Sequence, residues 1–116
     1  MPQINLYIAK KLDDLKKHQL QIEIANSIDV LPGKTKEILS VCIVDGLSIY
    51  KNGQPINGAF IDVRIFQDAT EEGKRELTSL LFDIASRVLD VPKNQMNINY
   101  IELQDWGSAG IYKIAQ

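Results

Sequence analysis

The sequence has a single cysteine, Cys42, and a single histidine, His18, among its 116 residues. One cysteine excludes an intrachain disulfide and a metal site built from several cysteines. One histidine leaves transition-metal binding and Ser–His or Cys–His catalysis without the residues they use. We expect Cys42, inside the apolar run 38–44, to be a small buried hydrophobic residue, and His18, among Lys and Gln residues, to be solvated. The sequence therefore predicts neither a metal ion nor a cofactor.

The chain also lacks an excess of one charge and any long hydrophobic run. The formal net charge is −2, from 13 basic and 15 acidic residues, and the basic residues are spread along the chain. This pattern gives no reason to expect nucleic acid or an anionic membrane as a partner. No apolar run approaches the ~20 residues of a membrane span, and the N-terminus lacks the pattern of a signal peptide. We therefore expect a cytoplasmic protein that binds no nucleic acid and no membrane.

The pattern of apolar residues predicts one domain, residues 1–116, made of two similar halves. Hydrophobic residues make up 45% of the chain and charged residues 24%, which is typical of a soluble globular protein. Each half, about 2–45 and about 59–103, has the order strand, helix, strand, and the two are offset by about 60 residues. The expected elements are strands near 2–9, 37–45, 59–67 and 95–103 and helices near 12–29 and 70–90.

The helix expected over 70–90 has the clearest pattern. Asp68 and Glu71 predict a capping box at its start, and Pro92 marks its end. Its apolar residues follow the i, i+3, i+4, i+7 spacing of one buried face: Leu77, Leu80, Leu81, Ile84, Ala85 and Val88. The helix expected over 12–29 has a less regular pattern, and its candidate buried face consists of Leu15, Ile22, Ala25 and Ile28.

Each half is typical of a βαβ unit, with parallel strands and a right-handed crossover through the helix. Two such units side by side predict an α/β (α+β) fold, a four-stranded mixed sheet with both helices on one face. The segment 45–58 between them is rich in turn signals around a short strand expected at 47–50.

The strand expected at 59–67 has two different sides. Ile61, Val63 and Ile65 are expected to face the helices, and the other side carries Phe60, Asp62, Arg64 and Phe66. A side that mixes aromatic residues with an opposite-charge pair suits contact with another subunit, so we expect a homo-oligomer. A solvated face with two tolerated phenylalanines is the alternative.

Pro2, directly after Met1, is the candidate catalytic residue. Methionine aminopeptidases remove Met1 before a small residue such as proline, which leaves a free secondary amine. Pro2 opens the apolar run 2–8, and an amine held there by a strand is poorly solvated, so its pKa is expected to fall. A base that is neutral near pH 7 takes a proton from carbon. If Met1 remains, the Pro2 nitrogen is an amide without basicity, and Pro2 is then only a common second residue.

The order and spacing of several short segments resemble the tautomerase superfamily, in particular its macrophage migration inhibitory factor branch. These segments span nearly the whole chain: Pro2, Pro32-Gly33-Lys34, Asp45-Gly46, Phe66, Asn97-Ile98-Asn99-Tyr100 and Asp105-Trp106-Gly107. The family forms homotrimers in which the uncovered sheet faces turn inward. Its active sites lie between neighbouring subunits, around the N-terminal proline, and the resemblance implies the same arrangement here.

The resemblance also implies roles for individual residues. Pro2 matches the base that moves a proton between carbon and oxygen of a keto–enol pair. Lys34 matches a lysine that helps to hold the substrate carboxylate, and a cation there would lower the pKa of the amine further; a plain surface lysine is the alternative. Phe66 matches an apolar pocket residue whose backbone also contacts the substrate.

Three further positions are implied in the same way. Asn99 matches an asparagine contributed across the subunit boundary, and Trp106 matches a tryptophan at the pocket rim, with ordinary packing as its alternative. Asn97 stands where the macrophage factor has a tyrosine. By alternation it faces the same side as Asn99 and can line the pocket, but it supplies neither a phenol nor an aromatic wall.

The resemblance thus implies a cofactor-independent tautomerase, an isomerase acting on small 2-keto acids of the phenylpyruvate type. Two alternatives remain open from the sequence. One is a non-enzymatic trimeric binding or signalling module that retains the fold, since fold does not establish function. The other is a hydration or decarboxylation carried out by a protonated proline.

Overall fold

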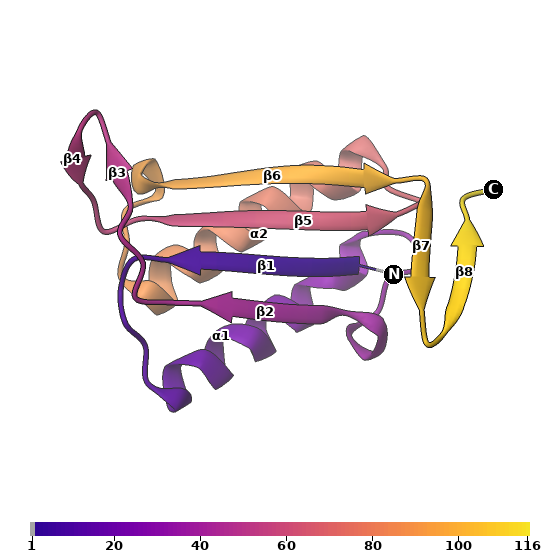
Figure 1. Ribbon diagram of the computed structural model, residues 1–116, viewed down its shortest axis with the longest axis horizontal. Helices are drawn as coiled ribbons and strands as arrows, with labels where there is room; N and C mark the ends of the chain where they lie inside the picture. Colours follow the sequence, from indigo (N-terminus) through magenta and orange to yellow (C-terminus); the bar gives the residue numbers. More distant parts are fainter. Residues whose placement is uncertain (1) are drawn as a thin grey trace.

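Two strand–helix–strand units make up most of the structure (Figure 1). The computed structural model describes residues 2–116, so the expected removal of Met1 lies outside the described residues. The first unit and its turns contain β1 (Pro2–Ile8), α1 (Asp14–Ser27), η1 (Ile28–Val30), η2 (Lys36–Ile38) and β2 (Ser40–Val44). The small hairpin β3 (Tyr50–Lys51) and β4 (Gln54–Pro55) follows. The second unit contains β5 (Ala59–Phe66), α2 (Glu71–Leu89), η3 (Lys93–Gln95) and β6 (Met96–Leu103), and the hairpin β7 (Asp105–Ser108) and β8 (Ile111–Ile114) ends the chain.

The sheet confirms the predicted fold. Its strand order is β2-β1-β5-β6, with β1 parallel to β2, β5 parallel to β6, and β1 antiparallel to β5. Both helices lie on the same side of this sheet (Figure 1). The six predicted elements are all present, and their ends differ from the expected ones by a few residues at most.

The core fills the space between the sheet and the two helices. Ile61, Val63 and Ile65 are fully buried on the helix side of β5, as predicted. The predicted face of α2 is also buried, except that Leu80 is only partly covered. Removing this apolar surface from water is the main favourable term in folding. Within residues 2–116, no helix is long and apolar enough to cross a membrane.

The predicted buried face of α1 was wrong at two of its four positions, because Ile28 is buried and Ala25 is partly buried. Leu15 is 79% exposed and Ile22 is 41% exposed, whereas Leu20 and Ile24 are buried and continue to the buried Ile28. The helix carries two apolar stripes, because residues 15 and 22 lie about 20° apart around the axis and residues 20 and 24 lie on the opposite side. Periodicity alone does not decide which stripe packs against the sheet.

The predicted start of α2 was also wrong. Thr70 is its N-cap, and the Thr70 hydroxyl accepts a hydrogen bond of 3.0 Å from the Gly73 amide. Asp68 has a φ of 59°, outside the extended region that an N-cap residue adopts. The capping box of Asp68 and Glu71 therefore does not form.

Two expectations in the first half were overturned by the strand pattern. Cys42 is exposed, not buried: in the edge strand β2, Val41 and Ile43 pack toward the core, so alternation turns Cys42 to the other side. Of the strand expected at 47–50, only Tyr50 is in a strand, because β3 begins there.

Asp45 ties the first unit together. One of its carboxylate oxygens accepts a 2.7 Å hydrogen bond from the Leu12 amide, and the other lies 3.5 Å from the Lys17 ammonium. The backbone bond, followed by the Lys17 charge, holds the pKa of Asp45 below its ordinary value of 3.8. A lowered folded-state pKa contributes stability above the ordinary value, and this contribution is lost as the pH falls through the lowered pKa.

Asp45→Asn is expected to lower the urea midpoint at pH 7, because the charged acceptor at the start of α1 is lost. The difference in urea midpoint between this variant and the wild type is expected to disappear as the pH is brought below 3.8. Asp29→Asn is the control, because Asp29 is exposed and its carboxylate makes no hydrogen bond with residues 2–116. If Asp45→Asn lowers the urea midpoint by the same amount at every pH, the Asp45 charge does not stabilise the fold in this way.

Candidate active site

Pro2 is buried at the first position of β1, where it pairs with Ile65 of β5. The first position of a strand accepts proline because no ladder bond from its N–H is needed there. The start of β1 lies at the end of the sheet where β5 and β6 finish (Figure 1). The nitrogen of Pro2 is thus held at this end of the sheet by the register of two strands.

Lys34 reaches the same end of the sheet from the turn after α1 and η1. Its amide bonds the Leu31 carbonyl, and Gly33 supplies the positive φ of 70° that this turn needs. The Lys34 side chain is only 6% exposed, and its Nζ donates a 3.1 Å hydrogen bond to the Phe66 carbonyl. No carboxylate of residues 2–116 forms an ion pair with it. A buried cation that has no counter-ion favours an anionic ligand.

Phe66 and Trp106 form an apolar wall at this end of the sheet. Phe66 is 5% exposed, Trp106 is half-buried, and their ring centroids lie 6.4 Å apart at an angle of 50°. This geometry is within the range of favourable aromatic pairs. Phe66 follows Ile65, the strand partner of Pro2, so the structure brings four of the six predicted site residues to one end of the sheet.

Asn97 and Asn99 lie elsewhere in the same chain. They are exposed on β6, on the side away from the helices, beside Phe60 and Asp62 of β5. At about 3.3 Å per residue, Asn99 sits about 10 Å and Asn97 about 17 Å along the sheet from the level of Pro2. The Asn99 amide donates a 2.6 Å hydrogen bond to Asp62. A single subunit therefore does not bring either asparagine to the proline.

The chain leaves the site through a strained turn that the sequence did not predict. Gln67 and Asp68 follow Phe66 with φ values of 54° and 59°. The left-handed conformation costs roughly 1–2 kcal/mol for a residue other than glycine. The Gln67 side chain accepts a 3.1 Å hydrogen bond from the Gln116 amide, which ties the end of the β7–β8 hairpin to this turn. Asp68 is of a residue type that adopts this conformation more often than most, but Gln67 is not, so no local signal predicts two such residues in succession.

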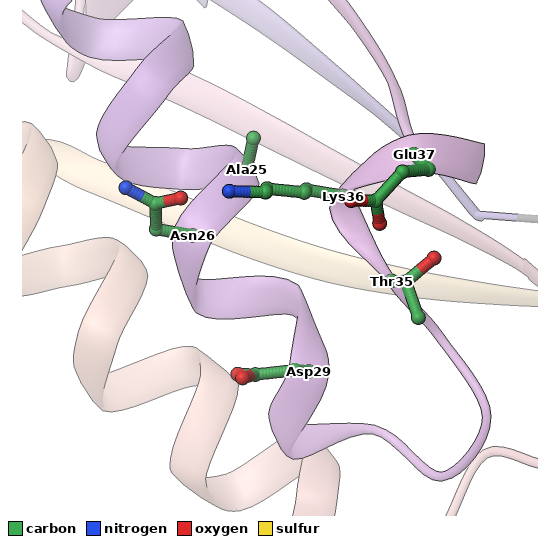
Figure 2. Close-up of a pocket in the computed structure, with 6 residues that line it drawn as sticks. All are labelled: Ala25, Asn26, Asp29, Thr35, Lys36 and Glu37. Atoms are coloured by element: carbon green, nitrogen blue, oxygen red, sulfur yellow. The ribbon is translucent and has the colours of Figure 1, made fainter.

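Two hollows border the region. The one in Figure 2, about 260 Å³, lies between the end of α1 and the loop after Lys34 and has charged residues of both signs. Figure 2 shows the Lys36 side chain extending toward α1. The hollow contains none of the six predicted site residues. A second hollow of about 240 Å³ lies next to the strained turn and is lined in part by Gln67, Leu103 and Gln116. Among residues 2–116, no group of three or more His, Cys, Asp or Glu is placed to hold a metal ion.

Known proteins share this architecture. No protein-family model matches the chain, and no curated protein matches it either. Solved structures do match. Leishmania major MIF2 superposes with a TM-score of 0.90 over 97% of each chain, at 17% identity. The chain has the fold of the tautomerase superfamily.

Two other matches come from different proteins of this fold. Pt0534, in a structure of the protein inactivated by 2-oxo-3-pentynoate, has a TM-score of 0.83 and 18% identity over 93% of each chain. A fused 4-OT described as an asymmetric trimer has a TM-score of 0.84 and 21% identity over 97% of this chain and 95% of its own. The resemblance to the macrophage migration inhibitory factor branch is thus confirmed in the fold. Identities this low show the fold alone.

The strained turn leads to a stability prediction. Gln67→Gly is expected to be more stable than Gln67→Ala by about 1 kcal/mol, because both lose the side-chain amide and only glycine adopts a positive φ without strain. Asp68→Gly and Asp68→Ala are expected to show the same order in urea unfolding.

The matched control is Glu76, which is exposed in the interior of α2. There, alanine is expected to be more stable than glycine by about 1 kcal/mol. Finding alanine better than glycine at positions 67 and 68 as well would show that the turn is not left-handed in solution.

Proposed function

We propose that this protein is a cofactor-independent keto–enol tautomerase acting on small 2-keto acids of the phenylpyruvate type, with Pro2 as the general base. The observation that carries this proposal is that the buried, unpaired ammonium of Lys34 bonds the carbonyl of Phe66, the residue after Ile65, which is the strand partner of Pro2. A base and an anion-binding cation side by side, next to an apolar wall, suit a substrate that is both a carboxylate and a carbon acid.

The chemistry begins once Met1 is removed and Pro2 carries a secondary amine. Burial disfavours the charged form of that amine and so favours a neutral base. The base takes the proton from C3 of the 2-keto acid, the electron pair moves to the carbonyl oxygen, and the same proton is delivered to that oxygen to give the enol. The reverse sequence converts the enol to the keto acid.

The surrounding residues hold the substrate during this transfer. Lys34 binds the carboxylate and stabilises the negative charge that develops on the adjacent enolate oxygen. Phe66 and Trp106 pack against the apolar part of the substrate and exclude water. Asn97 and Asn99 lie too far from Pro2 within one chain, so in this proposal they reach the site from a neighbouring subunit of a homotrimer.

Two similar structures support parts of the proposal. The inactivation of Pt0534 by 2-oxo-3-pentynoate, a reactive 2-keto acid, supports this substrate class. The trimeric state of a fused 4-OT supports a homotrimer, and the exposed Phe60 on the uncovered sheet face agrees with it.

A non-enzymatic trimeric binding module is the second candidate. It is favoured by Asn97, which stands where the macrophage factor has a tyrosine, and by the carbonyl of Phe66, which already accepts a hydrogen bond from Lys34. Such a module would bind carboxylates without turning them over. A protonated Pro2 acting as an acid in hydration or decarboxylation is a third and weaker candidate.

The first test is the ultraviolet-monitored ketonisation of enol-phenylpyruvate by protein whose intact mass shows that Met1 is absent. Pro2→Ala is expected to reduce the rate by roughly 10²–10⁴-fold, the usual contribution of a general base. Equal rates in the two proteins, or no rate above background, would remove the phenylpyruvate assignment and favour the binding module.

The role of Lys34 has a separate test. Lys34→Met is expected to lower kcat/KM for enol-phenylpyruvate by roughly 10–100-fold, because a charge-assisted contact worth about 1.5–3 kcal/mol is lost. The methyl ester of the substrate lacks the carboxylate charge but still forms the enolate, so Lys34→Met is expected to slow the ester less than the acid. An equal loss for the acid and the ester would show that Lys34 does not recognise the carboxylate.

A further inference from the structure

The side of the sheet opposite the helices, which we call the open face, contains one acid and one base. The four strands of the sheet hold three charged residues: Asp62, Arg64 and Glu102. Glu102 points to the helix side, where it pairs with Lys74 of α2. Asp62 and Arg64 alternate with the buried residues of β5 and therefore lie on the open face.

Arg64 is a half-buried cation without a partner. Its Nε is inaccessible to solvent and has no hydrogen-bond acceptor among residues 2–116. No carboxylate of that range forms an ion pair with its guanidinium. A buried N–H without an acceptor loses its hydration and gains nothing in return. The arrangement therefore favours an acceptor that comes from outside the chain.

Asp62 is the matching anion. It is also half-buried, and one of its oxygens accepts the hydrogen bond from Asn99, but no cation of residues 2–116 pairs with it. It lies two positions before Arg64 on the same side of the strand, about 6.6 Å away along the chain. No carboxylate oxygen of Asp62 lies within 4.0 Å of a guanidinium nitrogen of Arg64. The open face thus presents one unpaired acid beside one unpaired base.

We propose that Arg64 of one subunit forms an ion pair with Asp62 of the next subunit, so that a second copy of this chain occupies the open face. This inference rests on the homotrimer of the proposed function and names the contact that closes it. In a ring of three, each subunit gives its base to one neighbour and its acid to the other, so every charge finds a partner. Phe60, 40% exposed on the same face, adds apolar surface to the contact.

Charge reversal tests the pair, with the size of the assembly measured by analytical ultracentrifugation. The wild type is expected to be a trimer. Arg64→Asp and Asp62→Arg each place like charges in contact, and each is expected to raise the dissociation constant on the order of tenfold or more. The double variant Arg64→Asp/Asp62→Arg is expected to assemble again. Glu76→Arg, an equal change of charge on the outside of α2, is the control and is expected to leave the trimer unchanged.

Mixing distinguishes a pair between subunits from a pair within one. In an equimolar mixture of tagged Arg64→Asp and untagged Asp62→Arg chains, each mixed trimer has two acid–base contacts and one like-charge contact, because a ring of three cannot alternate two variants. The mixture is therefore expected to assemble more tightly than either variant alone and less tightly than the double variant. Rescue in the double variant, together with a mixture that assembles no more tightly than either variant alone, would overturn the proposal. Single variants with the dissociation constant of the wild type, or a wild type that is monomeric, would overturn it as well.

Two neutral variants keep the test valid if the reversed charges prevent folding, which far-UV circular dichroism detects. Arg64→Gln and Asp62→Asn are expected to weaken the trimer by similar factors, and combining them to add little, because a broken pair cannot be broken twice. Additive effects would overturn the pair. Assembly is measured without substrate, so a trimer with the expected couplings and no tautomerase activity would support the pair while removing the proposed activity.

Discussion

The antiparallel pairing of β1 with β5 is the contact on which the rest of the structure depends. It runs from Pro2 opposite Ile65 to Ile8 opposite Ala59 and joins two parallel units into one sheet. Each unit alone would hold two strands over one helix, and so short a segment buries a smaller share of its surface than the joined domain does. The same register carries the N-terminus to the end of β5, where Phe66 accepts the hydrogen bond from Lys34. The fold and the candidate site therefore share one constraint.

The sequence predicted the elements whose burial is decided locally. The alternation of Ile61, Val63 and Ile65 and the single apolar stripe of α2 each have one way to pack, and the structure confirms both. It failed where two packings compete. In α1, two stripes offered equal candidates and the sheet selected the one through Leu20. For Cys42, an apolar neighbourhood in sequence says little about a residue that alternation turns away from the core.

The candidate site follows the same division. Pro2 and Lys34 were predicted from motifs. Their placement at the same end of the sheet depends on strand register and on a turn, which no short pattern encodes. The left-handed Gln67 and the missing partner of Arg64 are visible only in three dimensions, because each depends on contacts between distant segments. Asn97 and Asn99 remain away from Pro2 in one chain, so a site that includes them has to be completed by assembly.

If Pro2 is the general base, its nitrogen is neutral at physiological pH. The most direct measurement is a titration of the Pro2 nitrogen by ¹⁵N NMR in protein lacking Met1. The general-base role of Pro2 predicts a pKa below the ordinary range of an α-amine, because the residue is buried and the unpaired Lys34 ammonium lies at the same end of the sheet. A pKa within or above that range would contradict it, since the proline would then be protonated and could act only as an acid.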